Sequence, residues 1–225
     1  MGLGHSPRIV TDGLVLCFDA ANKRSYGGSG TTWTDLKGDN DGTLENGPTF
    51  TTDNLGGITL DGSDDKITIP LASLPTPQNS SDFTYEAIVK FDVVSHFECV
   101  FSQDNGTGTG RFLLGSDRAT KRPVTFVTGS QIVSSNLDAI EAGGIYALSF
   151  GVSGSNVYIG QNGVLDLVNT NSFSYTGNGE IRLGVEPGGG GSNLAGDIYS
   201  FRIYNRFLSA EELRQNYLAT KGRYA

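Results

Sequence analysis

The sequence predicts an all-β fold, a two-sheet antiparallel sandwich with one short helix near the C-terminal end. Short apolar runs alternate along the 225 residues with clusters of Gly, Asn, Asp and Ser, the pattern of many strands joined by turns. Glycine supplies 32 residues, and a single segment has a helical period. Twelve Phe and nine Tyr provide aromatic volume to fill a core between two sheets. No composition break divides the chain, so we expect one domain.

The N-terminal third contains apolar strands separated by a long polar excursion. Residues 13–20 form a first strand, and the glycine-rich residues 21–47 follow it with Trp33 as an aromatic anchor. Residues 56–70 are expected to form a hairpin, because Gly, Ser and Asp at residues 62–64 are typical of a turn.

The remaining strands are expected to supply most of the core. In residues 83–93 the face formed by positions 83, 85, 87, 89 and 91 is apolar, and Ile88 is the exception to the alternation. Tyr199 and Phe201 are also expected to point into the core. Further strands are expected at residues 96–103, 111–116, 123–129, 180–185 and 197–205, with three more in residues 146–168, where the Asn162–Gly163 pair predicts a hairpin.

The one helical segment begins with a recognisable capping sequence. Ser209 is a good N-cap, and Glu212 stands three residues later, where it completes a capping box. Leu208 and Leu213 occupy the positions of a hydrophobic staple. We expect a helix over residues 210–218 that covers an open end of the sandwich and has a structural role only.

Five of these segments resemble, in the same order, the laminin G-like, concanavalin A-like lectin/glucanase jelly-roll family. They are GLVLCFDAANKRSYGGSGTTWTDLKGDNDGTLENGPTF (13–50), GGITLDGSDDKITIP (56–70), FTYEAIVKF (83–91), NVYIGQNGVLDLV (156–168) and GDIYSFRIYNRFLSAEEL (196–213). The sequence departs from the family pattern at Leu60, at Lys66, and at Ile88, where the family usually has tryptophan. The resemblance implies a single jelly-roll domain over residues 13–225, preceded by an N-terminal arm at residues 1–12.

The opening GHSPRIVTDGLVLCFDAAN (4–22) resembles virion proteins of tailed bacteriophages, especially marine and cyanobacterial ones. This resemblance implies a non-enzymatic structural protein that decorates the capsid or forms part of a tail or fibre. Such a protein is assembled in the host cytoplasm, which fits the absence of a signal-peptide core in the first 13 residues. Its partners would be capsid or tail proteins, in many copies. In the polar arm, the expected assembly contacts are Gly2, His5, Pro7 and Arg8.

Family members hold a calcium ion between the first and last strands, and Asp19 and Asp197 are the matching positions. Carboxylate oxygens are the ligands that Ca²⁺ prefers, so calcium is the one cofactor that the sequence suggests. The alternative is that both aspartates cap turns or pair with Arg202 or Arg206.

A lectin role is the principal rival to the virion role, and the virion protein itself would use glycan binding to adhere to host cells. Sugar recognition needs an aromatic face beside polar groups. Tyr26 and Trp33 lie in one glycine-rich loop and Tyr175 in another, so these three residues are the candidate carbohydrate site. The alternative for Trp33 is that it anchors its loop to the core.

A glycoside hydrolase is the third possibility. The sequence has no E-x-D-x-E run to place two carboxylates on one strand face, and Glu86, which matches a family position, stands alone. The net charge of −8 argues against nucleic-acid binding, and no apolar run approaches the roughly 20 residues of a membrane helix. Cys17 and Cys99 are expected to be buried free thiols.

Overall fold

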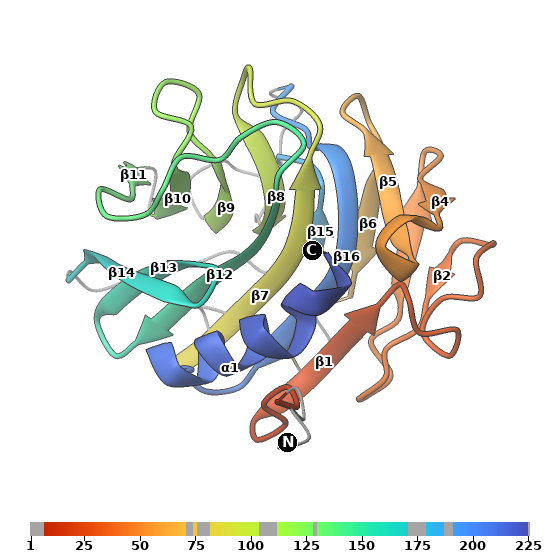
Figure 1. Cartoon of the computed structure of the whole chain (residues 1–225), viewed down its shortest axis with the longest axis horizontal. Helices are drawn as coiled ribbons and strands as arrows, with labels where there is room; N and C mark the ends of the chain where they lie inside the picture. Colours follow the sequence, from red (N-terminus) through yellow and green to blue (C-terminus); the bar gives the residue numbers. More distant parts are fainter. Residues whose placement is uncertain are drawn as a thin grey trace, which may run out of the picture.

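Two antiparallel sheets pack face to face in the computed structural model, and a helix crosses the outer surface of the first sheet (Figure 1). The structure describes residues 7–70, 74–75, 82–103, 112–127, 130–170, 179–186 and 191–224. Within these ranges each sheet has eight strands. The predicted fold class, an all-β sandwich with a short C-terminal helix, is confirmed.

The first sheet has the order β14-β13-β12-β7-β16-β5-β4, and β1 also pairs with β16. Its strands are β1 (Leu14–Asp19), β4 (Thr49–Thr51), β5 (Gly57–Asp61), β7 (Asp82–Phe91), β12 (Ile145–Ser153), β13 (Asn156–Gln161), β14 (Val164–Asn169) and β16 (Ala195–Tyr204). The second sheet has the order β11-β10-β9-β8-β15-β6-β3-β2. Its strands are β2 (Thr32–Trp33), β3 (Gly42–Glu45), β6 (Lys66–Ile69), β8 (Glu98–Gln103), β9 (Phe112–Ser116), β10 (Pro123–Val127), β11 (Ser130–Val133) and β15 (Ile181–Leu183).

Three helical segments complete the described chain: η1 (Asp53–Leu55), α1 (Ala210–Thr220) and η2 (Lys221–Arg223). None of the helices in the described residues is long and apolar enough to cross a membrane.

The turn at residues 62–64 joins strands of opposite sheets, so the hairpin predicted for residues 56–70 is wrong. Strand β5 pairs with β4 and β16 in the first sheet, whereas β6 pairs with β3 and β15 in the second. The turn is closed locally, because Asp65 Oδ2 accepts the Asp61 amide at 3.1 Å and Asp61 Oδ1 accepts the Ser63 amide at 2.7 Å. Both strands bury apolar residues in one core, so the chain crosses from sheet to sheet here.

Aromatic rings from both sheets fill the centre of the sandwich. Six fully buried rings contact one another: Phe83, Tyr85, Phe101, Phe112, Phe150 and Phe201. Phe112 and Phe150 are stacked with ring centroids 5.2 Å apart. The Tyr85 hydroxyl donates to the carbonyl of Pro75 at 2.7 Å, so the polar tip is satisfied inside the core. The apolar face predicted for residues 83–91 is confirmed.

An irregular step between Ile198 and Ser200 turns Tyr199 away from this core. We predicted that Tyr199 and Phe201 would point the same way, because they are two residues apart. The structure corrects this: Tyr199 is buried on the outer face of the first sheet, where it packs with Ile88. A bulge adds one residue to a strand and so reverses the alternation beyond it.

Helix α1 begins as the sequence predicts but lies elsewhere. Ser209 Oγ accepts the Glu212 amide at 3.3 Å, and Glu212 Oε2 accepts the Ser209 amide at 3.0 Å, which completes the capping box. The helix lies across the outer face of the first sheet, over β7 and β16, and not over an open end of the sandwich (Figure 1). It packs Leu213 into a cluster with Leu208 and Tyr204.

A buried ion pair lies beneath this helix. Arg202 of β16 donates from Nη1 to Glu86 Oε2 of β7 at 3.1 Å, and both side chains are about 3% exposed. Asn216 of α1 donates from Nδ2 to the same Glu86 oxygen and to the Tyr204 hydroxyl, both at 3.0 Å. The pair therefore fixes the helix to the two strands at the centre of the sheet.

Part of the segment expected to be a free arm belongs to the same assembly. Asn216 Oδ1 accepts the Val10 amide at 2.8 Å, and the Tyr204 hydroxyl donates to the Val10 carbonyl at 3.1 Å. Gln215 Nε2 donates to the carbonyl of Arg8 at 2.7 Å. The side chains of Pro7 and Arg8 are exposed, and the candidate contacts Gly2 and His5 lie outside the described residues.

Replacing Glu86 with Ala should lower the free energy of unfolding by about 3–5 kcal/mol, because Arg202 would remain buried without its counter-charge. Urea denaturation measures this change. The double variant Glu86→Met, Arg202→Met removes both charges and should recover most of the loss. As a control, Glu180→Ala removes an exposed carboxylate 3.8 Å from Arg182 and should cost less than about 1 kcal/mol. If Glu86→Ala lowers the free energy of unfolding no more than Glu180→Ala does, the buried ion pair does not hold these elements together.

Candidate functional site

A pocket of about 150 Å³ opens on the outer face of the second sheet and combines aromatic rings with polar groups. We call it the Phe97–Phe126 pocket; its lining residues are Phe97, Asp117, Arg118, Phe126, Gln131, Glu186 and Ser192. They come from the residue before β8, the segment after β9, strands β10 and β11, and the segments on either side of residues 187–190. Phe126 faces outward because it pairs with Leu113, whose neighbours Phe112 and Leu114 both point into the core.

The two phenylalanines form the apolar wall of the pocket. Their ring centroids are 5.5 Å apart and their planes meet edge to face at 86°. Both side chains are only half-buried, so part of each ring is accessible. Gly115 makes room for this arrangement: a Cβ there would lie 2.9 Å from the Phe97 ring and would overlap the Glu98 carbonyl. Such accessible rings suit the CH face of a sugar.

The position of Phe97 is fixed by its neighbours on both sides. Glu98 is fully buried, and its Oε2 accepts the amide of Ala195 in β16 at 3.1 Å. His96 Nε2 lies 3.2 Å from Glu98 Oε1. Burial raises the pKa of Glu98, against the lowering effect of the Ala195 amide and of His96. The start of β8 is therefore held rigidly at the edge of the pocket.

Asp117 organises the polar side of the pocket. Its Oδ2 accepts the amides of Ala119 and Thr120 and the Thr120 hydroxyl, at 3.1, 2.6 and 2.8 Å. Its Oδ1 accepts from Gln131 Nε2 at 2.7 Å, which orients the Gln131 amide. Burial alone would raise the pKa of Asp117, but the hydrogen bonds outweigh it and hold the pKa below its ordinary value. The carboxylate thus stays ionised and holds the Gln131 amide and the backbone of residues 119–120 in fixed positions.

The structure corrects the predicted carbohydrate site. Trp33 is fully buried and stacks on Phe18 with ring centroids 5.0 Å apart, so it anchors its loop to the core. Tyr26 is 4% exposed, and its hydroxyl donates to the carbonyl of Gly30 at 2.7 Å. Neither ring can serve as an exposed platform. Tyr175 lies outside the described residues.

The two aspartates expected to hold calcium have separate partners. Asp19 lies opposite Ser200 and not opposite Asp197, and both of its carboxylate oxygens accept from Arg223, at 2.9 and 3.2 Å. Its Oδ1 also caps a turn by accepting the Ala21 amide.

Asp197 accepts the Thr59 hydroxyl at 2.6 Å and lies 3.6 Å from the ammonium of Lys90. Asp19 and Asp197 are therefore not brought together as one set of ligands. Asp19 instead follows the alternative prediction, because it caps a turn and pairs with an arginine. That arginine is Arg223, and not Arg202 or Arg206.

Among the described residues, a different group of three aspartates has the geometry to hold a metal ion. Asp61, Asp64 and Asp65, in the turn between β5 and β6, have carboxylate oxygens within 4.8 Å of one another. Asp61 and Asp64 are exposed and Asp65 is buried. Burial raises the pKa of Asp65, with further contributions from its two acidic neighbours, against the Asp61 amide that lowers it.

Comparison with known proteins agrees with this architecture. A model of the concanavalin A-like lectin/glucanases superfamily, Laminin_G_3, matches residues 61–214. This two-sheet sandwich therefore falls in the class of concanavalin A-like folds. The chain is a member of the concanavalin A-like lectin/glucanases superfamily.

Several solved structures share the fold at low sequence identity. Trypanosoma rangeli sialidase in complex with sialic acid superposes with a TM-score of 0.71 at 15% identity, over 99% of this chain and 35% of the sialidase. Domain 4 of AbnA, an extracellular arabinanase from Geobacillus stearothermophilus, was solved in complex with arabinotriose. It superposes with a TM-score of 0.67 at 17% identity, over 92% of this chain and 98% of that domain. The receptor-binding domain of botulinum neurotoxin type G superposes with a TM-score of 0.66 at 14% identity, over 92% of this chain and 51% of the solved chain.

These likenesses show the fold alone, and the chain spans about a third of the length of the sialidases. No curated protein sequence matches the chain.

The residues of the Phe97–Phe126 pocket carry no local sequence signal. Strand alternation places Phe97 on the same face as Phe101, which is in the core. The structure separates them by an irregular step between Cys99 and Phe101, which is not visible in the sequence. Asp117 and Gln131 are 14 residues apart and meet because β10 and β11 form a hairpin.

Replacing Asp117 with Asn should lower the free energy of unfolding by about 1.5–3 kcal/mol at pH 7, because hydrogen bonds to an ionised acceptor are lost. The folded pKa lies below the ordinary value. The stabilisation is therefore present above about pH 4 and is lost as the pH falls through the folded pKa, so wild type and variant should converge in acid.

Urea denaturation at pH 7, 5 and 3 measures the difference. Asp138→Asn, at an exposed position, is the control and should change the stability by less than about 0.5 kcal/mol throughout. If the difference in the free energy of unfolding between wild type and Asp117→Asn stays constant down to pH 3, the carboxylate charge is not the source of the stabilisation.

Proposed function

We propose that the protein is a non-enzymatic carbohydrate-binding jelly roll and that it binds glycan at the Phe97–Phe126 pocket. The observation that carries the proposal is the pairing of two accessible rings with an oriented amide and an ionised carboxylate in one concave site. A sugar presents apolar CH faces and hydroxyls together, and this pocket offers a partner to each. The fold is also shared with domains solved in complex with saccharides.

The ionised state of Asp117 supports binding over hydrolysis. A glycosidase needs a carboxylic acid whose pKa is raised so that it can protonate the leaving oxygen. The pKa of Asp117 is instead lowered, and its oxygens are occupied by four hydrogen bonds. Glu86, which matches a family position, is buried beneath α1 and paired with Arg202, out of reach of a saccharide.

The ligand best suited to the site is a neutral oligosaccharide. The lining contains two carboxylates, of Asp117 and Glu186, and one guanidinium, of Arg118. This mixture does not favour a strongly charged glycan of either sign. Neutral hydroxyls can accept from the Arg118 guanidinium and from the Gln131 amide.

A glycan array with the purified protein tests this function. We expect retention on neutral glycans, and a loss of affinity on the order of tenfold or more for Phe97→Ala and for Phe126→Ala, because each removes half of the apolar wall. Leu167→Ala truncates an exposed apolar side chain on β14 and is the matched control with unchanged binding. Reducing-end assays on the bound glycans should detect no hydrolysis. Equal binding by wild type and both Phe variants would refute the site.

We propose further that this domain is displayed on a tailed-bacteriophage particle, on the capsid or on a tail or fibre. The arrangement of the two faces supports this. Residues 8–10 are fixed against α1 on the outer face of the first sheet, with Pro7 and Arg8 exposed there. The Phe97–Phe126 pocket lies on the outer face of the second sheet. A contact through the N-terminal segment would therefore leave the pocket pointing away from the particle.

Purified particles should contain the protein at a fixed copy number, which quantitative mass spectrometry measures. Deleting residues 2–7 should abolish this incorporation, because it removes the proposed contacts Gly2, His5 and Pro7. It should preserve the melting temperature and glycan binding, because Val10 keeps its bonds to Asn216 and Tyr204. Incorporation of the truncated protein at full copy number would exclude the segment as the anchor. Particles that lack the intact protein would exclude the virion role.

A further inference from the structure

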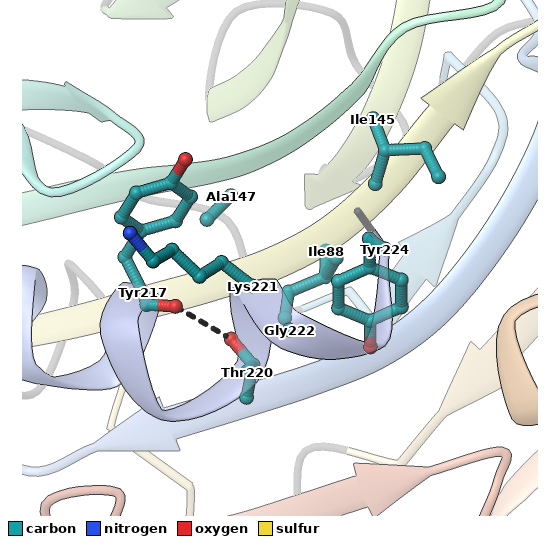
Figure 2. Close-up of a pocket in the computed structure, with 8 residues that line it drawn as sticks. All are labelled: Ile88, Ile145, Ala147, Tyr217, Thr220, Lys221, Gly222 and Tyr224. Carbon is teal, nitrogen blue, oxygen red and sulfur yellow. Dashed lines mark hydrogen bonds between the residues drawn. The ribbon is translucent and has the colours of Figure 1, made fainter. Parts of the chain in front are cut away.

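A second cavity, of about 290 Å³, lies between the C-terminal turn and the outer face of the first sheet (Figure 2). Its floor consists of Ile88 of β7 with Ile145 and Ala147 of β12. Figure 2 shows the ring of Tyr217 at one end and that of Tyr224 at the other, with residues 221–222 between them. The cavity is thus an apolar slot bounded by two aromatic rings, on the opposite sheet from the Phe97–Phe126 pocket.

Two small residues keep the slot open. Ala147 pairs with Ile88 across the strands and leaves a depression where a longer side chain would fill the floor. Gly222 lies at the mouth, and a Cβ there would meet no atom within 4 Å. Its backbone does not have the positive φ that favours glycine. Neither backbone conformation nor close packing therefore requires glycine at this position, and its effect is to leave the entrance free.

A positive charge that has no carboxylate partner among the described residues stands at the rim. The Lys221 ammonium lies 5.8 Å from the centroid of the Tyr217 ring, and within the described chain it forms no salt bridge. The neighbouring Arg223 is neutralised by Asp19 at 2.9 Å. In a chain with a net charge of −8, this leaves a local site for one negative charge beside an apolar slot.

We propose that the slot binds a small planar aromatic molecule that carries one carboxylate. The flat body lies between the Tyr217 and Tyr224 rings on the aliphatic floor, where it gains ring-to-ring and apolar contacts. The carboxylate lies at the rim, where Lys221 supplies a charge-assisted hydrogen bond. Burial raises the pKa of Tyr224 to about 12, so this wall stays uncharged at neutral pH and does not repel an anion. The site is separate from the glycan pocket and does not depend on it.

Isothermal titration with indole-3-acetate tests the proposal, with indole-3-ethanol as an uncharged probe of similar shape. For a ligand of this size we expect a dissociation constant on the order of 0.1–1 mM. The acid should bind at least about fivefold more tightly than the alcohol because of Lys221. Lys221→Met should abolish this preference, whereas Lys37→Met, at an exposed lysine in the loop between β2 and β3, should retain it.

Filling the slot distinguishes it from any other binding surface. Ala147→Leu and Gly222→Leu should each abolish binding of both probes without lowering the melting temperature, because the added side chains occupy empty space. Phe126→Ala, which removes part of the glycan pocket, should bind indole-3-acetate like wild type. The proposal is overturned if wild type binds neither probe at millimolar concentration, if a folded filled variant still binds, or if acid and alcohol bind equally well.

Discussion

The buried contact between Glu86 and Arg202 is the constraint on which the outer face of the first sheet depends. Two charges removed from water require each other and further polar partners. Asn216 supplies one such partner to Glu86, so the helix must lie where that amide reaches the pair. The same asparagine then accepts the Val10 amide, which brings the N-terminal segment to the helix. One polar network thus determines where α1, β7, β16 and residues 8–10 meet.

The two outer faces of the molecule also differ in what covers them. The outer face of the first sheet is covered by α1, η2 and the N-terminal segment, and its polar groups are used to hold those elements. On the outer face of the second sheet, near β8 to β11, no helix of the described residues lies over the strands, and half-buried Phe97 and Phe126 stand beside Asp117. A ligand site on the second sheet therefore does not compete with the interactions that stabilise the first.

Much of the fold could be predicted from the sequence, because the signals involved are local. Alternation identified the core face of residues 83–91, and the capping box placed the start of α1 at Ser209. Errors arose where a strand changed face or sheet: the irregular step beside Tyr199, and the turn at residues 62–64 that joins the sheets.

The candidate site was harder to predict than the fold. Trp33 was a plausible sugar platform because it is a large ring in a polar loop, yet burial of its ring against Phe18 gains more than exposure would. The groups that do form a pocket, such as Asp117 and Gln131, are polar residues of common type in separate segments. Only the pairing of β10 with β11 brings them together.

Strand β16 has a further consequence for how the chain acquires its structure. It pairs with β7, β5 and β1, whose residues lie roughly a hundred or more positions earlier in the chain. During synthesis those three strands leave the ribosome with the edges that will receive β16 still unpaired, and they remain so until residues 195–204 emerge. Such distant pairing slows folding and leaves strand edges open to association with other chains. The nascent protein is therefore most vulnerable to aggregation until residues 195–204 have emerged, and folding chaperones would act in that interval.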